Sequence, residues 1–157
     1  MQAGSHESTW VHATRAPINL EDIQAWAAEP GCGAIALFLG IVRAHSDGRT
    51  GVTAITYEAY ESTLQKSLDL VASHVLNAFP SVRRLAIWHR IGRVELGEPS
   101  LVIAAATAHR REAFAACEFA VDSVKASLPI WKFEHSTEGD GWAVTHQPIV
   151  DLSHERS

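Results

Sequence analysis

The sequence predicts a single α+β domain, and two observations support this fold class. The chain has 157 residues, a length that suits one domain and leaves little room for two. Three segments carry apolar residues at the three- and four-residue spacing of helices, and six or seven shorter segments are β-rich or continuously apolar. Such a mixture, without an internal repeat or a low-complexity linker, is typical of about three helices packed on an antiparallel or mixed sheet.

The first part of the chain predicts a tail, a helix and a buried strand. Residues 1–16 show no clear periodicity, so we expect a flexible N-terminal tail there. Asn19 is a suitable N-cap, and the helix that it starts ends at Pro30. The nearly continuous apolar run 33–42 predicts a buried strand, and the polar, glycine-containing run 43–51 predicts a loop.

The middle of the chain predicts a second helix between two strands. Residues 52–60 are β-rich and alternate in part, which predicts a strand. Ser62 and Gln65 have the spacing of a capping box for a helix that ends at Pro80. Residues 85–91 then predict another strand.

The last part predicts the clearest helix, with short strands on either side. Residues 93–96 and 100–108 predict two strands separated by a turn. Apolar residues then recur at helical spacing over residues 109–128, and Pro129 ends that helix. The remaining expected elements are strands at 130–135 and 142–147 and a C-terminal tail at 148–157.

Composition excludes several classes of protein. The formal net charge of −5 argues against non-specific nucleic-acid binding, which needs a basic surface. The longest apolar stretches are too short to span a bilayer, and the polar N-terminus does not resemble a secretion signal, so we expect a cytoplasmic protein without membrane contact. The two cysteines, Cys32 and Cys117, form no CxxC pair, and no HExxH spacing occurs, so we expect no disulfide framework and no metal site.

The positive side chains are concentrated in a few segments. Of three lysines, Lys125 and Lys132 lie seven residues apart, and most arginines stand in pairs or beside histidine. In an acidic protein, this distribution is compatible with a pocket that binds an anion. The alternative is solvated surface charge, which we favour for any single arginine taken alone.

Two segments deliver cations at the ends of predicted strands. The segment FLGIVRAH carries Arg43 and His45 directly after the buried strand, where functional side chains are common. The segment AHRREAF places His109 and Arg110 at a helix start, whose free N–H groups favour anions and where cations alone oppose the helix dipole. For each segment the alternative is a polar surface without a ligand.

A third segment, DSVKASLPIWKFE, contains both paired lysines. Lys125 lies at the edge of the apolar stripe of its helix, and Lys132 shares one side of the following strand with Glu134. A lysine that is partly shielded by apolar neighbours has a lowered pKa, which suits proton transfer or the stabilisation of a developing anion. The alternative is that both ammonium groups extend to water.

Taken in order, the motifs resemble one family. The segments are GAIALFLGIVR, YEAY, HRIGRVELGE, AHRREAF, VDSVKASLPIWKFE and GDGW. Together they resemble the large, catalytic subunit family of molybdopterin synthase, from about Pro17 to Gln147. The resemblance therefore sets the expected domain at residues 17–147.

The resemblance implies an α/β hammerhead-type fold and a sulfur-transfer reaction. Two large subunits would form a homodimer, and each would bind a small ubiquitin-like carrier to give a heterotetramer. The carrier's C-terminal Gly-Gly thiocarboxylate would supply sulfur to cyclic pyranopterin monophosphate, which becomes molybdopterin with its dithiolene. Because the sulfur arrives on the partner, the enzyme would need no catalytic cysteine and no cofactor.

The same resemblance implies roles for eight side chains. Lys125 and Lys132 would be catalytic, while Arg43, His109 and Arg110 would hold the phosphate and pterin. Glu134 would orient a lysine or support the pocket, and Phe38 would line the channel for the carrier tail. The family tends to carry a basic residue just after the GDxW turn, where the nearest candidate in this chain is His146.

Two other functions remain compatible with the sequence. A phosphate-ester hydrolase or lyase would use the histidine and arginine cluster, but it would also need a nucleophile or a metal site. A non-catalytic dimeric adaptor that binds another protein's tail would not need both lysines.

Overall fold

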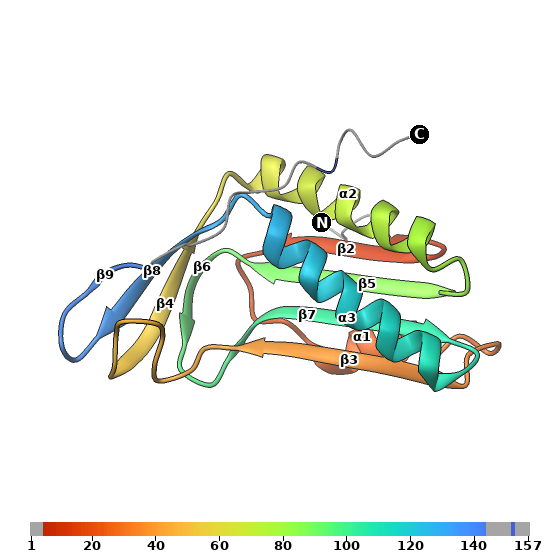
Figure 1. The fold of residues 1–157 in the computed structure, drawn as a ribbon, viewed down its shortest axis with the longest axis horizontal. Helices are drawn as coiled ribbons and strands as arrows, with labels where there is room; N and C mark the ends of the chain where they lie inside the picture. The colour runs from red at the N-terminus through yellow and green to blue at the C-terminus, as the bar shows by residue number, and fades with distance from the viewer. Residues whose placement is uncertain (1–4, 144–151, 153–157) are drawn as a thin grey trace.

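The computed structural model describes residues 5–143 and residue 152 and arranges them in two sheets with three helices. The larger sheet has five strands in the order β1-β2-β5-β7-β3, and the smaller sheet has four in the order β6-β4-β8-β9. Figure 1 shows α2 and α3 lying across one face of the larger sheet, with the smaller sheet at one end of the molecule. The predicted α+β class, with three helices in the described part of the chain, is confirmed.

The helices and strands lie close to their predicted positions along the chain. The helices are α1 (Leu20–Ala27), α2 (Glu61–Ala78) and α3 (Arg110–Ser127). The strands of the larger sheet are β1 (Ser5–His6), β2 (Thr9–Thr14), β3 (Ala34–Ile41), β5 (Arg84–Arg90) and β7 (Pro99–Thr107). Those of the smaller sheet are β4 (Val52–Glu58), β6 (Gly92–Glu95), β8 (Trp131–Ser136) and β9 (Gly141–Trp142).

The expected flexible tail at residues 1–16 is wrong for residues 5–14. Strand β2 pairs in parallel with β5, which makes the larger sheet mixed, and β1 pairs antiparallel with β2. Val11 and Ala13 are buried on the face covered by α2 and α3, while Trp10 packs edge-on against Trp26 and Trp88 on the other face. The alternation in TWVHAT is short and includes a histidine, so it gave only a weak period-two signal. The expected C-terminal tail at 148–157 lies outside the described residues except for Leu152, which packs against the core.

The central strands of the larger sheet are buried on both faces. Leu85 and Ile87 of β5 face the core formed with α2 and α3, and the alternate residue Ala86 faces α1. Burying a side chain such as Leu85 or Ile87 contributes about 1.5–3 kcal/mol, so this two-sided core stabilises the larger sheet from both faces. The near-continuous apolar runs in the sequence reflect this two-sided burial.

Helix α1 begins as predicted. The Asn19 side chain accepts hydrogen bonds from the backbone N–H groups of Glu21 (3.0 Å) and Asp22 (3.3 Å). These bonds satisfy two of the N–H groups that a helix start leaves free. The predicted N-cap is confirmed.

Helix α2 begins without the predicted capping box. Its N-cap is Tyr60, and no side chain caps it. Instead of returning to Ser62, the Gln65 amide accepts a hydrogen bond from Ala13 N (3.0 Å) and donates one to Val11 O (3.0 Å). Among the described residues, β1 pairs with β2 only as far as Trp10, and the Gln65 amide bonds the backbone of this edge at Val11 and Ala13 as a peptide group would. Hydrogen bonds from Gln65 to β2 therefore take the place of the predicted capping box, which is wrong.

The smaller sheet is built around β4, which pairs antiparallel with both β6 and β8. Its own core includes Val52, Tyr57 and Val94, with Ile130 packed against it. Ile130 also packs against the core of the larger sheet, so this side chain joins the two sheets where α3 passes into β8. No described helix is long and apolar enough to cross a membrane.

Replacing Gln65 with alanine should lower the free energy of unfolding by about 1–2 kcal/mol, because two hydrogen bonds between α2 and β2 are lost. Ser62→Ala is the matched control, and its effect should stay within about 0.5 kcal/mol because Ser62 caps nothing. Urea unfolding of the two variants measures the difference. Equal losses for both would show that the capping box operates in solution.

Candidate active site

Lys132 lies in a group of charged side chains on one face of the smaller sheet. It pairs with Tyr57 across β4 and β8, so its side chain shares a face with Glu134, two residues further along β8. The pKa of Lys132 is lowered by partial desolvation first, and then by the positive charges of Lys125 and Arg43, while Glu134 opposes the shift. Its surface still reaches solvent. Three predicted cations therefore lie close enough to affect one another.

The local sequence explains how Lys125 meets Lys132. Lys125 stands in the last turn of α3, and the helix ends at Leu128 because Pro129 follows. The chain then turns into β8, which begins at Trp131. Arg43 directly follows Val42 at the end of β3, and its side chain is exposed. The corner between α3, β3 and β8 thus collects three positive charges.

Glu134 is the buried acid of this group. Its side chain is 2% exposed, it accepts a hydrogen bond of 2.5 Å from the Ser46 hydroxyl, and it forms an ion pair of 3.5 Å with Arg49. Its closest polar partners are thus in the loop that follows β3, and its role in orienting a lysine or supporting the pocket stays a prediction. Neither Ser46 nor Arg49 could be predicted from the sequence, because contacts between distant parts of the chain, such as that of Ser46 with Glu134 across 88 residues, leave no local signal.

His89 contacts Tyr57 beneath the sheet face that carries Lys132 and Glu134, which we call the lysine face. It is 5% exposed, its ring centroid lies 5.2 Å from that of Tyr57, and its Nδ1 donates to Arg90 O at 2.7 Å. Burial is the main reason that its pKa falls to about 4; the Arg90 carbonyl opposes this and Lys132 adds to it. The imidazole is therefore neutral near pH 7 and adds no charge beside Lys132.

His109 and Arg110 lie at the other end of α3. Both are exposed, with His109 as the N-cap and Arg110 as the first helical residue. Lys125 follows Arg110 by fifteen positions in the same helix, which corresponds to about 22 Å along the axis. Within one chain the structure does not bring His109 and Arg110 to the lysines.

Of the two remaining predicted site residues, Phe38 is described by the structure and His146 is not. Phe38 is paired with Ile103 in the larger sheet and packs partly buried against the core under α2 and α3. Its role in lining a channel stays a prediction. His146 lies outside the described residues.

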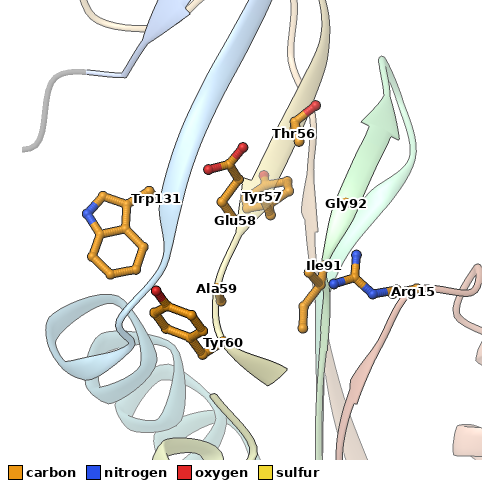
Figure 2. A pocket seen from close by; sticks show the side chains of 9 residues that line it. All are labelled: Arg15, Thr56, Tyr57, Glu58, Ala59, Tyr60, Ile91, Gly92 and Trp131. Atoms are coloured by element: carbon orange, nitrogen blue, oxygen red, sulfur yellow. The ribbon is translucent and has the colours of Figure 1, made fainter. Parts of the chain in front are cut away.

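An open cavity of about 520 Å³ lies near the base of the smaller sheet (Figure 2). Figure 2 shows the rings of Trp131 and Tyr60 on one side, Glu58 between the elements, and Arg15 beside Ile91 on the other side. The complete lining is Arg15, Thr56, Tyr57, Glu58, Ala59, Tyr60, Ile91, Gly92 and Trp131. One cation and one carboxylate give no excess of positive charge, so the lysine face is the better candidate for an anion.

The arrangement of possible metal ligands and the state of the two thiols concern the described part of the chain. No group of three or more His, Cys, Asp or Glu side chains is placed there to hold a metal ion. Burial raises the pKa of the Cys117 thiol to about 11, and the pKa of Cys32 is also raised, first by burial and then by Glu29. Both thiols are therefore protonated and weakly nucleophilic near pH 7.

The buried His89 should make stability depend on pH. Its folded pKa of about 4 lies below the ordinary value of 6.5. The contribution of the neutral ring to the free energy of unfolding is therefore complete above pH 6.5 and is lost as the pH falls through 4. By pH 4 the loss should reach about 3 kcal/mol. His89→Asn should flatten the dependence of the unfolding free energy on pH between 4 and 6.5, measured by urea unfolding. The exposed His45→Asn should not, and equal slopes for both variants would contradict the assignment.

Comparisons with known proteins agree on one family. The family model described as MoaE protein matches residues 13–127. A molybdopterin synthase catalytic subunit from Nostoc sp. is 41% identical over 126 residues, which cover 80% of this chain and 76% of that protein.

Two solved structures share the fold. Molybdopterin synthase from Staphylococcus aureus superposes with a TM-score of 0.77 at 28% identity, covering 85% of this chain and 96% of that one. A complex of subunits 1 and 2 of the molybdopterin-converting factor from Helicobacter pylori has a TM-score of 0.70 at 20% identity, covering 87% and 92%, a likeness of fold. With a family match over most of its length and a relative at 41% identity, the chain belongs to the MoaE protein family, that of the molybdopterin synthase catalytic subunits.

Proposed function

We propose that this chain transfers sulfur from the thiocarboxylated C-terminus of a small carrier subunit to cyclic pyranopterin monophosphate, forming the dithiolene of molybdopterin. The observation that carries this proposal is the corner where α3 ends in the turn of Lys125, β3 leads into Arg43 and β8 begins beside Lys132. The positive charges of Lys125 and Arg43 both lower the pKa of Lys132 there. Both the carrier tail and the phosphorylated substrate are anionic, and this corner holds the positive charge to receive them.

The two lysines have complementary tasks in the proposed reaction. Release of sulfur from the carrier passes through a tetrahedral intermediate at its terminal carbonyl, where negative charge develops on oxygen. Lys125 stabilises that charge, and Lys132, whose lowered pKa eases loss of its proton, moves protons on the substrate side. Glu134 limits the shift and keeps the loop after β3 in place.

The substrate phosphate is held by arginine. A guanidinium presents two parallel N–H donors to two phosphate oxygens, which a lysine cannot do. Arg43 is exposed beside Lys132 and is the arginine best placed within this chain for that contact.

A second protomer completes the site in this proposal. His109 and Arg110 lie about 22 Å from Lys125 in their own chain, yet they place two exposed basic residues at a helix start, where the dipole disfavours cations. An anion held there would offset that cost. In a homodimer, His109 and Arg110 of the partner subunit would reach the lysines of this one.

The carrier is a separate subunit in this proposal. The relatives are named catalytic subunits, a name that implies a further subunit, and the Helicobacter pylori protein of the same fold is a complex of two. The two protonated thiols, Cys32 and Cys117, fit a reaction in which sulfur arrives on the carrier rather than on a cysteine of this chain. The soluble cytoplasm is the compartment in which we expect both subunits to meet.

Lys125→Ala should abolish product when the chain is combined with a thiocarboxylated carrier and cyclic pyranopterin monophosphate. Loss of charge stabilisation predicts a fall in rate of at least about 100-fold, with carrier binding unchanged within a few-fold. Lys66→Ala, which removes the exposed lysine of α2, is the matched control and should keep full activity. Full activity of Lys125→Ala would refute the mechanism. Binding of the carrier without product from the unaltered chain would favour a non-catalytic adaptor.

Mixed dimers test whether the partner completes the site. A protomer with Lys125→Ala and one with Arg110→Ala should each be inactive as homodimers. When they are co-expressed, half of the dimers are mixed and each holds one intact site, so activity should return to about a quarter of the unaltered level. No recovery, with mixed dimers demonstrated by differential tags, would place each complete site within a single chain.

A further inference from the structure

Arg49 reaches the lysine face from the loop after β3. The turn from Ser46 to Arg49 closes with backbone hydrogen bonds in both directions, and Gly48 supplies its left-handed conformation at φ 92°. This turn lays the Arg49 side chain over β8 and β9. There its Nη1 pairs with Glu134 Oε1 at 3.5 Å and donates to Gly141 O at 3.1 Å.

Gly141 makes room for the guanidinium. It pairs with Glu134 across β8 and β9, so a side chain at position 141 would point to the same face as Glu134 and Lys132. A Cβ at Gly141 would clash with Arg49 Nη2, so any other residue there would push the guanidinium away. The position opposite Glu134 therefore holds a positive group that comes from a different part of the chain.

The guanidinium keeps donors free for a ligand. Both of its contacts use Nη1, and within residues 5–143 neither Nη2 nor Nε has a hydrogen-bond partner. The side chain is 25% exposed, so these donors reach solvent. Glu134 and Lys132, two residues apart in a strand, are separated by about 7 Å, which places Arg49 within reach of a ligand on Lys132.

The local charge balance stays positive with Arg49 included. Arg43, Lys125, Lys132 and Arg49 share this region with the buried Glu134. Arg49 also helps to lower the pKa of the Asp140 carboxyl group. The hydrogen-bond partners of that carboxylate, however, are Ser136 N and the His135 ring. One buried acid thus orients Arg49 without cancelling the positive charge of the face.

We propose that Arg49 is a further substrate-binding residue, which donates Nη2 and Nε to the phosphate of the pterin substrate while Glu134 and Gly141 hold its Nη1. This inference rests on the proposed function and deepens it by assigning a second arginine to the anion. It also gives a reason for glycine at position 141.

The test is steady-state sulfur transfer with saturating carrier and varied cyclic pyranopterin monophosphate. Arg49→Ala should raise KM for the substrate by about 10- to 100-fold with a smaller change in kcat, because a charged two-donor contact is lost. Gly141→Ala should raise KM in the same direction, since it displaces the guanidinium while leaving every charge in place. Arg93→Ala, which removes an exposed arginine of β6 paired with Glu95, is the control and should match the unaltered chain.

Two double variants separate substrate binding from support of the fold. Arg49→Ala with Gly141→Arg supplies the guanidinium from the facing position and should lower the raised KM part of the way back to that of the unaltered chain. Arg49→Ala with Glu134→Gln removes the buried carboxylate that would otherwise lose its partner, and KM should stay high. If this second pair restores KM, Arg49 only neutralises Glu134 and the inference is overturned.

The remaining outcomes are distinct. An unchanged KM in both Arg49→Ala and Gly141→Ala overturns the role of Arg49 while leaving the proposed function intact. If the unaltered chain gives no product with any thiocarboxylated carrier, the proposed function fails. Equilibrium binding of cyclic pyranopterin monophosphate to the chain without carrier then decides the Arg49 contact independently.

Discussion

The junction between α3 and β8 is the constraint on which the rest of the site depends. Pro129 cannot continue the helix, so the chain leaves α3 after Leu128 and becomes extended at once. Ile130 packs against the cores of both sheets and so joins the smaller sheet to the larger one. Without this short connection the last turn of α3 would not face β8, and Lys125 would not influence Lys132.

The gathering of cations at this junction opposes stability, and the structure offsets it locally. Lys132 is partly desolvated beside two other positive groups, an arrangement that disfavours its charged form. Glu134 opposes that effect, and its own burial is made tolerable by Ser46 and Arg49. Beneath them, the neutral His89 fills space without adding to the repulsion. Such an arrangement is expected where a site must attract anions rather than maximise stability.

The sequence predicted the elements whose signals are local and missed those that depend on distant partners. Apolar periodicity located β7 and α3, because burial leaves continuous apolar runs and helical stripes. The apolar run 33–42 also located β3, but the expected burial is wrong: β3 lies at the edge of the sheet, and Leu37 and Ile41 are exposed. Strand β2 was missed since its pairing with β5, far along the chain, gives a six-residue strand its stability. Gln65 matched a local capping motif, yet its amide found better partners in Val11 and Ala13.

The site shows the same division between local and distant signals. Lys125 and Lys132 lie close together in the sequence and in space, whereas His109 and Arg110 belong to the same helix but to its opposite end. Nearness along the chain pointed to His146 as the basic group associated with the GDxW turn. His146 lies outside the described residues, and its role stays a prediction. Arg49, from a loop that composition described only as polar, donates to Gly141 O in that turn, a contact without a local signal.

Helix α3 acts as a rigid spacer between two charged ends. A helix changes length only in steps of about 1.5 Å per residue, and each added residue also rotates the far end by about 100°. Inserting or deleting a residue in Arg110–Ser127 would therefore shift and turn Lys125 relative to Arg110, whereas a surface loop absorbs such changes. In a dimer whose sites use both ends, the length of this helix would be as strictly determined as the identity of the lysine it carries.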